Sequence, residues 1–156
     1  VPCLMRGPGI PAGTVCDELT GTIDVLPSIA ALTSTPLPEG RKIDGLDVSG
    51  LWQGSIEKSP RDEFVHYTSN GQLEGIRKGK WKLLVKKPRV RRNQNRQAAA
   101  KPAQILLFDL SKDMGEQNNL AEQHPEVVTT LRGRMLAADK EVTENARSPW
   151  LKSSSE

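Results

Sequence analysis

The fold is decided by residues 73–85, which run LEGIRKGKWKLLV. In the second half of this stretch, Trp81, Leu83 and Val85 alternate with the lysines at 80, 82 and 86. Because successive side chains of a strand point to opposite faces of a sheet, this alternation predicts a strand with one buried face. The dipeptide Lys78-Gly79 marks a tight turn before it, since glycine adopts positive φ at no steric cost. The stretch therefore predicts an antiparallel hairpin with Trp81 in the core.

Further strands are expected on both sides of this hairpin. Phe64, Val65 and Tyr67 indicate a strand that ends at the turn signal Ser69-Asn70-Gly71. On the other side, the apolar residues 105–110 indicate a last strand, which the basic stretch 86–101 separates from the hairpin. We therefore predict an antiparallel meander of about four strands, with a long insertion before its last strand.

An amphipathic helix is predicted from Pro125 to about residue 145. Proline suits the first turn of a helix, because an N–H in that turn has no helical partner to lose. Apolar residues then recur at spacings of three and four, which places them on one helix face: Val128, Leu131, Met135, Ala138 and Val142. Such a helix would cover one face of the sheet, so we expect an α+β fold.

The amino-terminal third has a different pattern. The apolar run at residues 1–6 is bounded by Gly and Pro, which indicates a buried strand, although nothing ahead of it supplies a neighbouring strand. Residues 22–32 indicate a helix in which Asp24 caps the first turn. Its expected apolar face consists of Leu26, Ile29, Ala30 and Leu32.

Composition limits the functions of the 156 residues. No apolar run approaches the roughly 18 residues that a membrane span needs, and we expect no signal peptide from the first residues. Cys3 and Cys16 are too few for a disulfide framework and lack the spacing of a zinc site. Two interpretations stay open: one disulfide bridge between them, or two unpaired cysteines that act as small apolar side chains. With two histidines, His66 and His124, a His-rich metal site is excluded.

The positive charge of the chain is local. The net charge is +3 and the isoelectric point about 9.0, but residues 86–101 hold seven basic residues and no acid, which leaves 15 basic against 19 acidic residues elsewhere. We favour a solvated loop. The alternative is a polyanion contact through Lys86, Lys87, Arg89, Arg91, Arg92 and Arg96. The run holds no aromatic residue, which argues against stacking on nucleic-acid bases.

Candidate site residues are few. The sequence contains no nucleophile elbow, phosphate-binding glycine loop or HExxH zinc motif. The acidic residues near turns favour capping over metal ligation, and they are Asp44, Asp47, Asp109 and Asp113. Glu116 is interpreted as a loop hydrogen-bonding residue, and His124 as a helix cap. His66 beside Tyr67, with Asn70 in the adjoining turn, could hydrogen-bond a polar ligand; a solvated or structural His66 is the alternative.

Four stretches, in order, carry a resemblance to a known family. They are VP followed by GPGIPAG within residues 1–13, TIDVLPS at 22–28 with Ile43-Asp44-Gly45 after it, IRKGKWKL at 76–83, and LFDL at 107–110 with Asp113, Glu116, Asn119 and Leu120. Together they resemble the carboxy-terminal part of sulfatases, the arylsulfatase-like hydrolases of the alkaline-phosphatase superfamily. Met114 stands where the family pattern has Pro, and residues 86–101 look like an insertion peculiar to this chain.

The resemblance implies an enzyme that hydrolyses sulfate esters. Such an enzyme uses a formylglycine, made from the Cys or Ser of a C/S-x-P-S-R motif, and a divalent cation, usually calcium, held by Asp and Asn side chains. Neither Cys3 nor Cys16 lies in that motif, so no catalytic or metal-binding residue is carried over to this chain. The resemblance further implies that residues 1–58 are the last strand and helix of a large, here incomplete, α/β domain, that 59–146 are a small domain with the basic insertion, and that 147–156 are a disordered tail.

Two functions follow as hypotheses. In the first, the chain is the C-terminal fragment of a sulfatase, and its partners are the missing N-terminal catalytic domain and a sulfated small molecule or polysaccharide. In the second, it is a free-standing module that binds polyanions such as sulfated polysaccharide through residues 86–101. Neither nucleic acid nor a membrane is expected as a partner. The resemblance implies a periplasmic or secreted location, although the chain itself carries no address.

Overall fold

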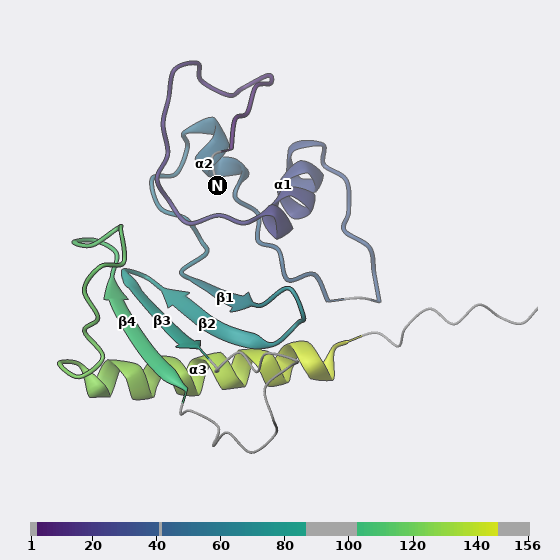
Figure 1. Ribbon diagram of the computed structural model, residues 1–156. Coiled ribbons are helices and arrows are strands. Elements are labelled where there is room, and N and C mark those ends of the chain that lie inside the picture. Colours follow the sequence, from purple (N-terminus) through teal and green to yellow (C-terminus); the bar gives the residue numbers. More distant parts are fainter. Residues whose placement is uncertain (1–2, 41, 87–102, 147–156) are drawn as a thin grey trace, which may run out of the picture. The chain divides into compact units, whose positions relative to one another are not determined.

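The computed structural model describes residues 3–40, 42–86 and 103–146 (Figure 1). The chain divides into two compact units, Val1–Glu63 (unit 1) and Phe64–Glu156 (unit 2). Unit 1 contains a short 3-10 helix and two α-helices, which are η1 (Thr22–Asp24), α1 (Val25–Leu32) and α2 (Ser49–Gln53). Unit 2 contains a sheet and a long helix, built from β1 (Glu63–Tyr67, whose first residue belongs to unit 1), β2 (Leu73–Lys78), β3 (Trp81–Lys86), β4 (Gln104–Asp109) and α3 (Pro125–Glu144).

The sheet of unit 2 has the strand order β1-β2-β3-β4, so each strand lies beside its neighbour in sequence. Strands β2, β3 and β4 pair antiparallel, with Ile76 opposite Leu83 and Leu83 opposite Leu107. Glycines with positive φ close the two tight turns, Gly71 at 72° and Gly79 at 53°. The predicted meander and its turns are therefore confirmed.

Helix α3 lies along one face of this sheet, as Figure 1 shows. The core forms between them, where Ile76, Leu83 and Leu107 of the sheet are fully buried with Leu131 and Met135 of the helix. Trp81 and Val128 pack against this core from its margin, while Val142 at the end of the predicted stripe is exposed. Burial of each large apolar side chain contributes roughly 1.5–3 kcal/mol, so this layer fixes the α+β fold expected from the sequence.

A polar loop covers the outer edge of β4. The Asn119 side chain accepts hydrogen bonds from the Leu107 and Ala121 amides and donates one to the Ile105 carbonyl. The Leu120 amide donates to the Leu107 carbonyl as well. An open strand edge invites association with other chains. These bonds satisfy that edge within the chain and explain why Asn and Leu follow the LFDL stretch.

The strand predicted over residues 1–6 is wrong for the residues that the structure describes. Cys3, Leu4, Met5 and Arg6 have no regular structure and are exposed. A strand needs a partner for its backbone hydrogen bonds, and none of the described residues between 3 and 62 lies in a strand. Cys3 and Cys16 are both free and exposed, so the bridge between them does not form. The predicted tail, 147–156, lies outside the described residues.

Candidate functional site

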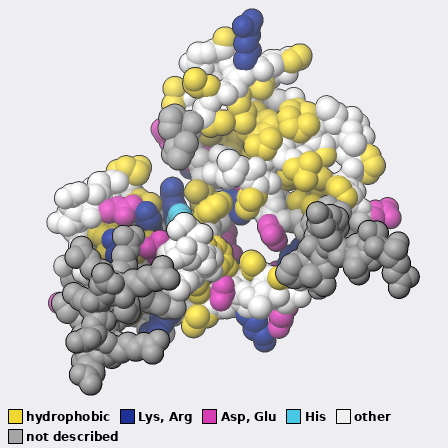
Figure 2. Space-filling model, turned by 45° about the vertical axis from the view of Figure 1, so that its right-hand side comes forward, with side chains coloured by type: hydrophobic (Ala, Val, Ile, Leu, Met, Phe, Trp, Pro, Cys, Tyr) yellow, Lys and Arg dark blue, Asp and Glu magenta, His cyan; other side chains and the backbone are white. Residues whose placement is uncertain are grey.

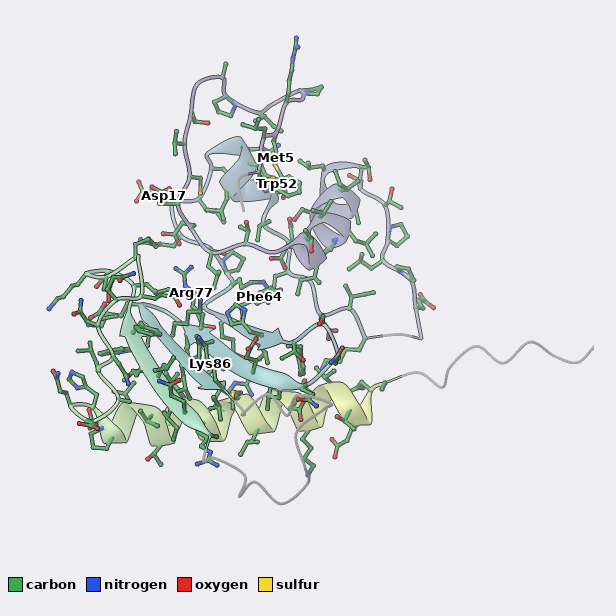
Figure 3. The ribbon with its side chains drawn as sticks, in the orientation of Figure 1. Met5, Asp17, Trp52, Phe64, Arg77 and Lys86 are labelled. Carbon is green, nitrogen blue, oxygen red and sulfur yellow. The ribbon has the colours of Figure 1, made fainter. Side chains whose placement is uncertain are left out.

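The sheet face turned away from α3 carries a mixed set of polar and aromatic side chains. Ile76 and Leu83 point toward α3, so Arg77 and Lys82 beside them point the other way. Arg77 and Lys82 lie directly opposite each other in the sheet, and Lys82 lies opposite Phe108. Figure 3 shows Phe64 of β1 and Arg77 of β2 on this same face. Strand alternation therefore gathers these residues on one surface, here called the free sheet face because α3 packs on the opposite one. The face is partly covered, since Phe108 is 5% exposed.

His66 in β1 lies on the same sheet face as Phe64. It follows Phe64 by two residues, and the two rings lie 5.5 Å apart at 49°. The buried Nε2 atom of His66 has no hydrogen-bond partner among the described residues. Burial lowers the pKa of His66, and the charge of Lys82 lowers it further. His66 is therefore a neutral imidazole near pH 7.

Lys82 and Glu116 form an ion pair beside this face. The Lys82 Nζ donates to Glu116 Oε1 at 2.5 Å, and both side chains are partly buried. Glu116 holds a left-handed backbone conformation, with φ at 55°, which is rare for residues other than glycine. Glu116 thus forms a hydrogen bond from its loop, as predicted. The pair places an ammonium and a carboxylate near His66, since both charges act on the pKa of the imidazole.

The structure does not bring the predicted ligand-binding residues onto one surface. His66 and Tyr67 are neighbours in β1, so their side chains point to opposite faces of the sheet. Tyr67 is 37% exposed. Asn70 lies in the exposed turn between β1 and β2, next to Gly71. His66 therefore shares the free sheet face with Phe64, whereas Tyr67 and Asn70 belong to the strand end.

Most of the predicted polyanion-binding residues fall outside the described residues. Lys86 is the last residue of β3 and is exposed. Figure 3 labels it on the sheet. The others, Lys87, Arg89, Arg91, Arg92 and Arg96, lie in the part of the chain on which the structure gives no description. The contact through residues 86–101 therefore stays a prediction.

Unit 1 contains a buried ion pair that the sequence interpretation missed. The carboxylate of Asp24, 1% exposed, accepts hydrogen bonds from the Arg61 guanidinium at 2.5–3.1 Å. It also accepts from the backbone amides of Gly21 and Leu46, at 2.8 Å each. Burial alone would raise the pKa of Asp24, but the Arg61 and amide hydrogen bonds outweigh burial and lower it.

Asp24 was predicted to cap the first turn of the helix, and this is confirmed for η1, where its carboxylate accepts from the Gly21 amide that precedes the turn. The carboxylate makes no capping hydrogen bond to α1, and it also binds the segments around residues 46 and 61, which was not predicted. Ser28 acts similarly, because its hydroxyl donates to the Asp24 carbonyl and accepts from the Val48 amide. The spacing of residues within 22–28 does not indicate these contacts with Leu46, Val48 and Arg61, because the partners lie far along the chain. The buried carboxylate of TIDVLPS is therefore structural.

The residues of this chain do not fit the calcium and formylglycine that the sulfatase resemblance implies. No C/S-x-P-S-R motif occurs in the sequence. Asp109 is bound by the Ser111 hydroxyl and by Lys80, which lower its pKa to about 2. Asp113 accepts the Gln117 and Asn118 amides. These carboxylates are committed to hydrogen bonds, and the described residues contain no cluster of three or more His, Cys, Asp or Glu that could hold a metal ion.

Comparison with known proteins places this arrangement in a family. A family model described as the C-terminal region of aryl-sulfatase matches residues 59–149. The chain belongs to the sulfatase family. Human steryl-sulfatase is 31% identical over 160 residues, which cover 90% of this chain and 27% of the relative. Human arylsulfatase A is 35% identical over 150 residues, covering 84% of this chain and 29% of the relative.

The fold of the sulfatase chain agrees with a solved sulfatase as well. The crystal structure of the PsFucS1 sulfatase from Pseudoalteromonas sp. superposes with a TM-score of 0.68 at 18% identity, covering 91% of this chain and 30% of the other. At that identity, the likeness shows the fold alone. The chain spans less than a third of the length of the sulfatases it matches. Among the described helices of this sulfatase chain, none is long and apolar enough to cross a membrane.

Proposed function

We propose that the chain is the carboxy-terminal part of an enzyme that hydrolyses sulfate esters, and that the free sheet face contributes to binding the sulfated substrate. The match to the C-terminal region of aryl-sulfatase supports the first part. In this proposal the nucleophile and the calcium ligands belong to an N-terminal catalytic domain, because the residues described above do not fit either role. The chain supplies binding contacts and no step of the chemistry.

His66 carries the second part of the proposal. A buried polar atom without a partner costs about 1–3 kcal/mol, and such an atom calls for an explanation such as a bound ligand. The Nε2 atom of His66 is in that position among the described residues. A neutral imidazole can donate from Nε2 to an ester or sulfate oxygen. Tyr67 and Asn70 stay in the proposal as contacts from the end of β1.

The first test is the DNA that encodes the residues ahead of Val1. The proposal expects an open reading frame with an in-frame C/S-x-P-S-R motif. A start codon close to Val1 with no such motif would contradict it and favour the polyanion-binding alternative. This test needs no purified protein, and its result does not depend on His66.

The second test compares the two histidines in the protein together with its N-terminal domain. We expect His66→Gln to raise KM for 4-nitrophenyl sulfate by about tenfold, which corresponds to the loss of one hydrogen bond worth about 1.4 kcal/mol. His124→Gln is the matched control, because His124 is partly exposed and contacts Trp81 and Glu126. An equal KM for both variants, at equal thermal stability, would remove His66 from the substrate site.

A further inference from the structure

The turn between β1 and β2 contains the one Asn-Gly dipeptide of the sequence, Asn70-Gly71. Residues 69–72 are all exposed. The turn is held by Thr68, whose amide donates to the Gln72 carbonyl at 2.8 Å and whose hydroxyl accepts from the Gln72 amide at 3.1 Å. The Asn70 side chain therefore takes no part in holding the turn.

Asn70 differs in this respect from the other asparagines that the structure describes. The Asn118 side chain donates to a carboxylate of its own loop, and the Asn145 side chain donates to a carbonyl of α3 at 2.8 Å. Asn119 makes the hydrogen bonds at the edge of β4 that were given above. The Asn70 side chain makes no hydrogen bond with any described residue. Its amide group is therefore free to rotate toward the backbone that follows.

Gly71 leaves that backbone open to reaction. Its φ is 72°, and nothing lies within 4 Å of its Cβ position. The other described asparagines are followed by Asn119, Leu120 and Ala146, whose side chains hinder approach to the backbone nitrogen, whereas glycine has no side chain. The Gly71 amide donates to the Thr68 carbonyl at 2.9 Å. Because the turn is exposed, opening this bond costs little free energy.

We infer that Asn70 is a site of spontaneous deamidation. The deprotonated backbone nitrogen of Gly71 attacks the Asn70 Cγ atom, so that a new C–N bond forms and the bond from Cγ to the side-chain nitrogen breaks. That nitrogen leaves as ammonia, which takes up the proton lost from Gly71. One water molecule then opens the resulting succinimide ring at either of its carbonyls. The products are an aspartate at this position or an isoaspartate, in which the backbone runs through the former side chain.

The modification adds one negative charge near the end of β1. Because an aspartate has a pKa of about 3.9, the new carboxylate is ionised at neutral pH. Figure 2 shows acidic and basic side chains in small groups over the visible surface, so the added charge acts mainly on groups within about 10 Å of it. Asn70 is a substrate contact in the proposed function, and on that function rests the consequence that the modified form binds an anionic sulfate ester more weakly.

The modification is tested by incubating the purified chain in warm, mildly alkaline buffer, in which more of the Gly71 amide is deprotonated. Trypsin releases residues 62–77 as one peptide, in which Asn70 is the only asparagine. We expect a more acidic form of the chain to accumulate, and mass spectrometry to locate the change in this peptide. Asn70→Gln should abolish the acidic form, whereas Asn145→Gln, at another exposed asparagine, should leave it.

Three outcomes would overturn the inference. The first is no gain of the acidic form over the chain before incubation. The second is a change confined to peptides other than 62–77. The third is a change in 62–77 that occurs in the urea-unfolded chain and not in the folded one, because the folded turn would then prevent the attack.

The consequence for binding is tested with Asn70→Asp in the protein that carries its N-terminal domain. We expect KM for 4-nitrophenyl sulfate to rise about twofold in low salt, the effect of one charge at roughly 10 Å in water, and to return to its original value in high salt. Gln123→Glu is the control, because the adjacent His124 contacts Trp81 at the opposite end of β2 from this turn. Equal KM values for Asn70→Asp and the unsubstituted protein would overturn the effect on binding. Failure of the proposed function would instead appear as no hydrolysis by the unsubstituted protein, while the peptide measurement would be unaffected.

Discussion

Asp24 joins three segments of unit 1 through one carboxylate. Its partners lie 3, 22 and 37 residues away, at Gly21, Leu46 and Arg61. Both side chains of the pair are nearly inaccessible, at 1% for Asp24 and 10% for Arg61. A buried charge that loses its partner is costly because neither water nor a counter-charge replaces it. The stability of unit 1 should therefore depend on this pair more than on any exposed ion pair.

The first prediction is that Asp24→Asn destabilises the chain by about 3–5 kcal/mol, because it removes the buried carboxylate charge that accepts three hydrogen bonds from the Arg61 guanidinium. Urea unfolding followed by circular dichroism measures the loss. Asp17→Asn is the control, since Asp17 is exposed. A loss below roughly 1 kcal/mol, the range of exposed ion pairs, would show that the pair is solvated in solution.

Gly45 is required by a close approach of two backbones. A Cβ atom on Gly45 would lie 2.0 Å from the Ile23 carbonyl oxygen and 2.9 Å from Pro27. Gly133 in α3 is the opposite case, because nothing lies within 4 Å of its Cβ position. Two alanine substitutions should therefore change stability in opposite directions.

The second prediction is that Gly45→Ala destabilises the chain while Gly133→Ala stabilises it by about 0.5–1 kcal/mol, the usual gain for alanine over glycine inside a helix. The free energy of unfolding from urea titration measures both. Destabilisation by both substitutions would contradict the open surroundings of Gly133. Stabilisation by both would contradict the contact at Gly45.

At the residue scale the sequence predicted less than at larger scales. The capping contact of Asp24 with Gly21 could be predicted from local spacing, but its long-range partners Leu46 and Arg61 could not. His66 and Tyr67 were predicted as a pair because they are adjacent, whereas strand geometry sends neighbours to opposite faces. Applying the alternation of Phe64, Val65 and His66 to the predicted strand would have separated them.

At the element scale, strands and the long helix could be predicted because their signals are local. The spacing of Leu131, Met135 and Ala138 gave the buried face of α3, and all three are buried. The predicted strand at residues 1–6 failed because a strand depends on partners elsewhere in the chain. Helix α1 was predicted near its observed range, but of its predicted apolar face only Ala30 is buried.

The β3–β4 hairpin sets its own register. Six residue pairs connect the strands, from Trp81 opposite Asp109 to Lys86 opposite Gln104. The chain therefore leaves β3 and enters β4 at directly opposed positions, a spacing that a two-residue turn can close. We therefore expect the two strands to align in this register when a two-residue turn connects them.

The third prediction is that replacing residues 87–103 with Asn-Gly leaves the free energy of unfolding within about 1 kcal/mol of the original, because closure of long loops costs little extra entropy. Urea unfolding checks this. The same variant tests the polyanion contact, since heparin retention should fall in low salt if residues 86–101 provide it. Loss of cooperative unfolding would show that the replaced segment contributes to the fold.

At the scale of the whole molecule, the two units have different relations to function. Unit 2 contains the sheet and its core, and its free sheet face carries His66, the residue proposed to contact the substrate. Unit 1 contains an apolar helix whose large side chains face outward. Exposed apolar side chains gathered on one helix often mark an interaction surface. The match of residues 59–149 to the C-terminal region of aryl-sulfatase supports the same proposal, that the chain is part of a larger enzyme.

The last prediction concerns the activity of the chain by itself. Cleavage of a sulfate ester needs an activated nucleophile and stabilisation of the developing negative charge. The sequence has no C/S-x-P-S-R motif for a formylglycine, and the carboxylates of Asp24, Asp109 and Asp113 are engaged by Arg61, Ser111, Lys80 and backbone amides. We therefore expect the purified chain, with calcium added, to hydrolyse 4-nitrophenyl sulfate no faster than buffer. Turnover that disappears on His66→Gln or Asp109→Asn would contradict this, because a contaminating sulfatase would be unaffected by either substitution.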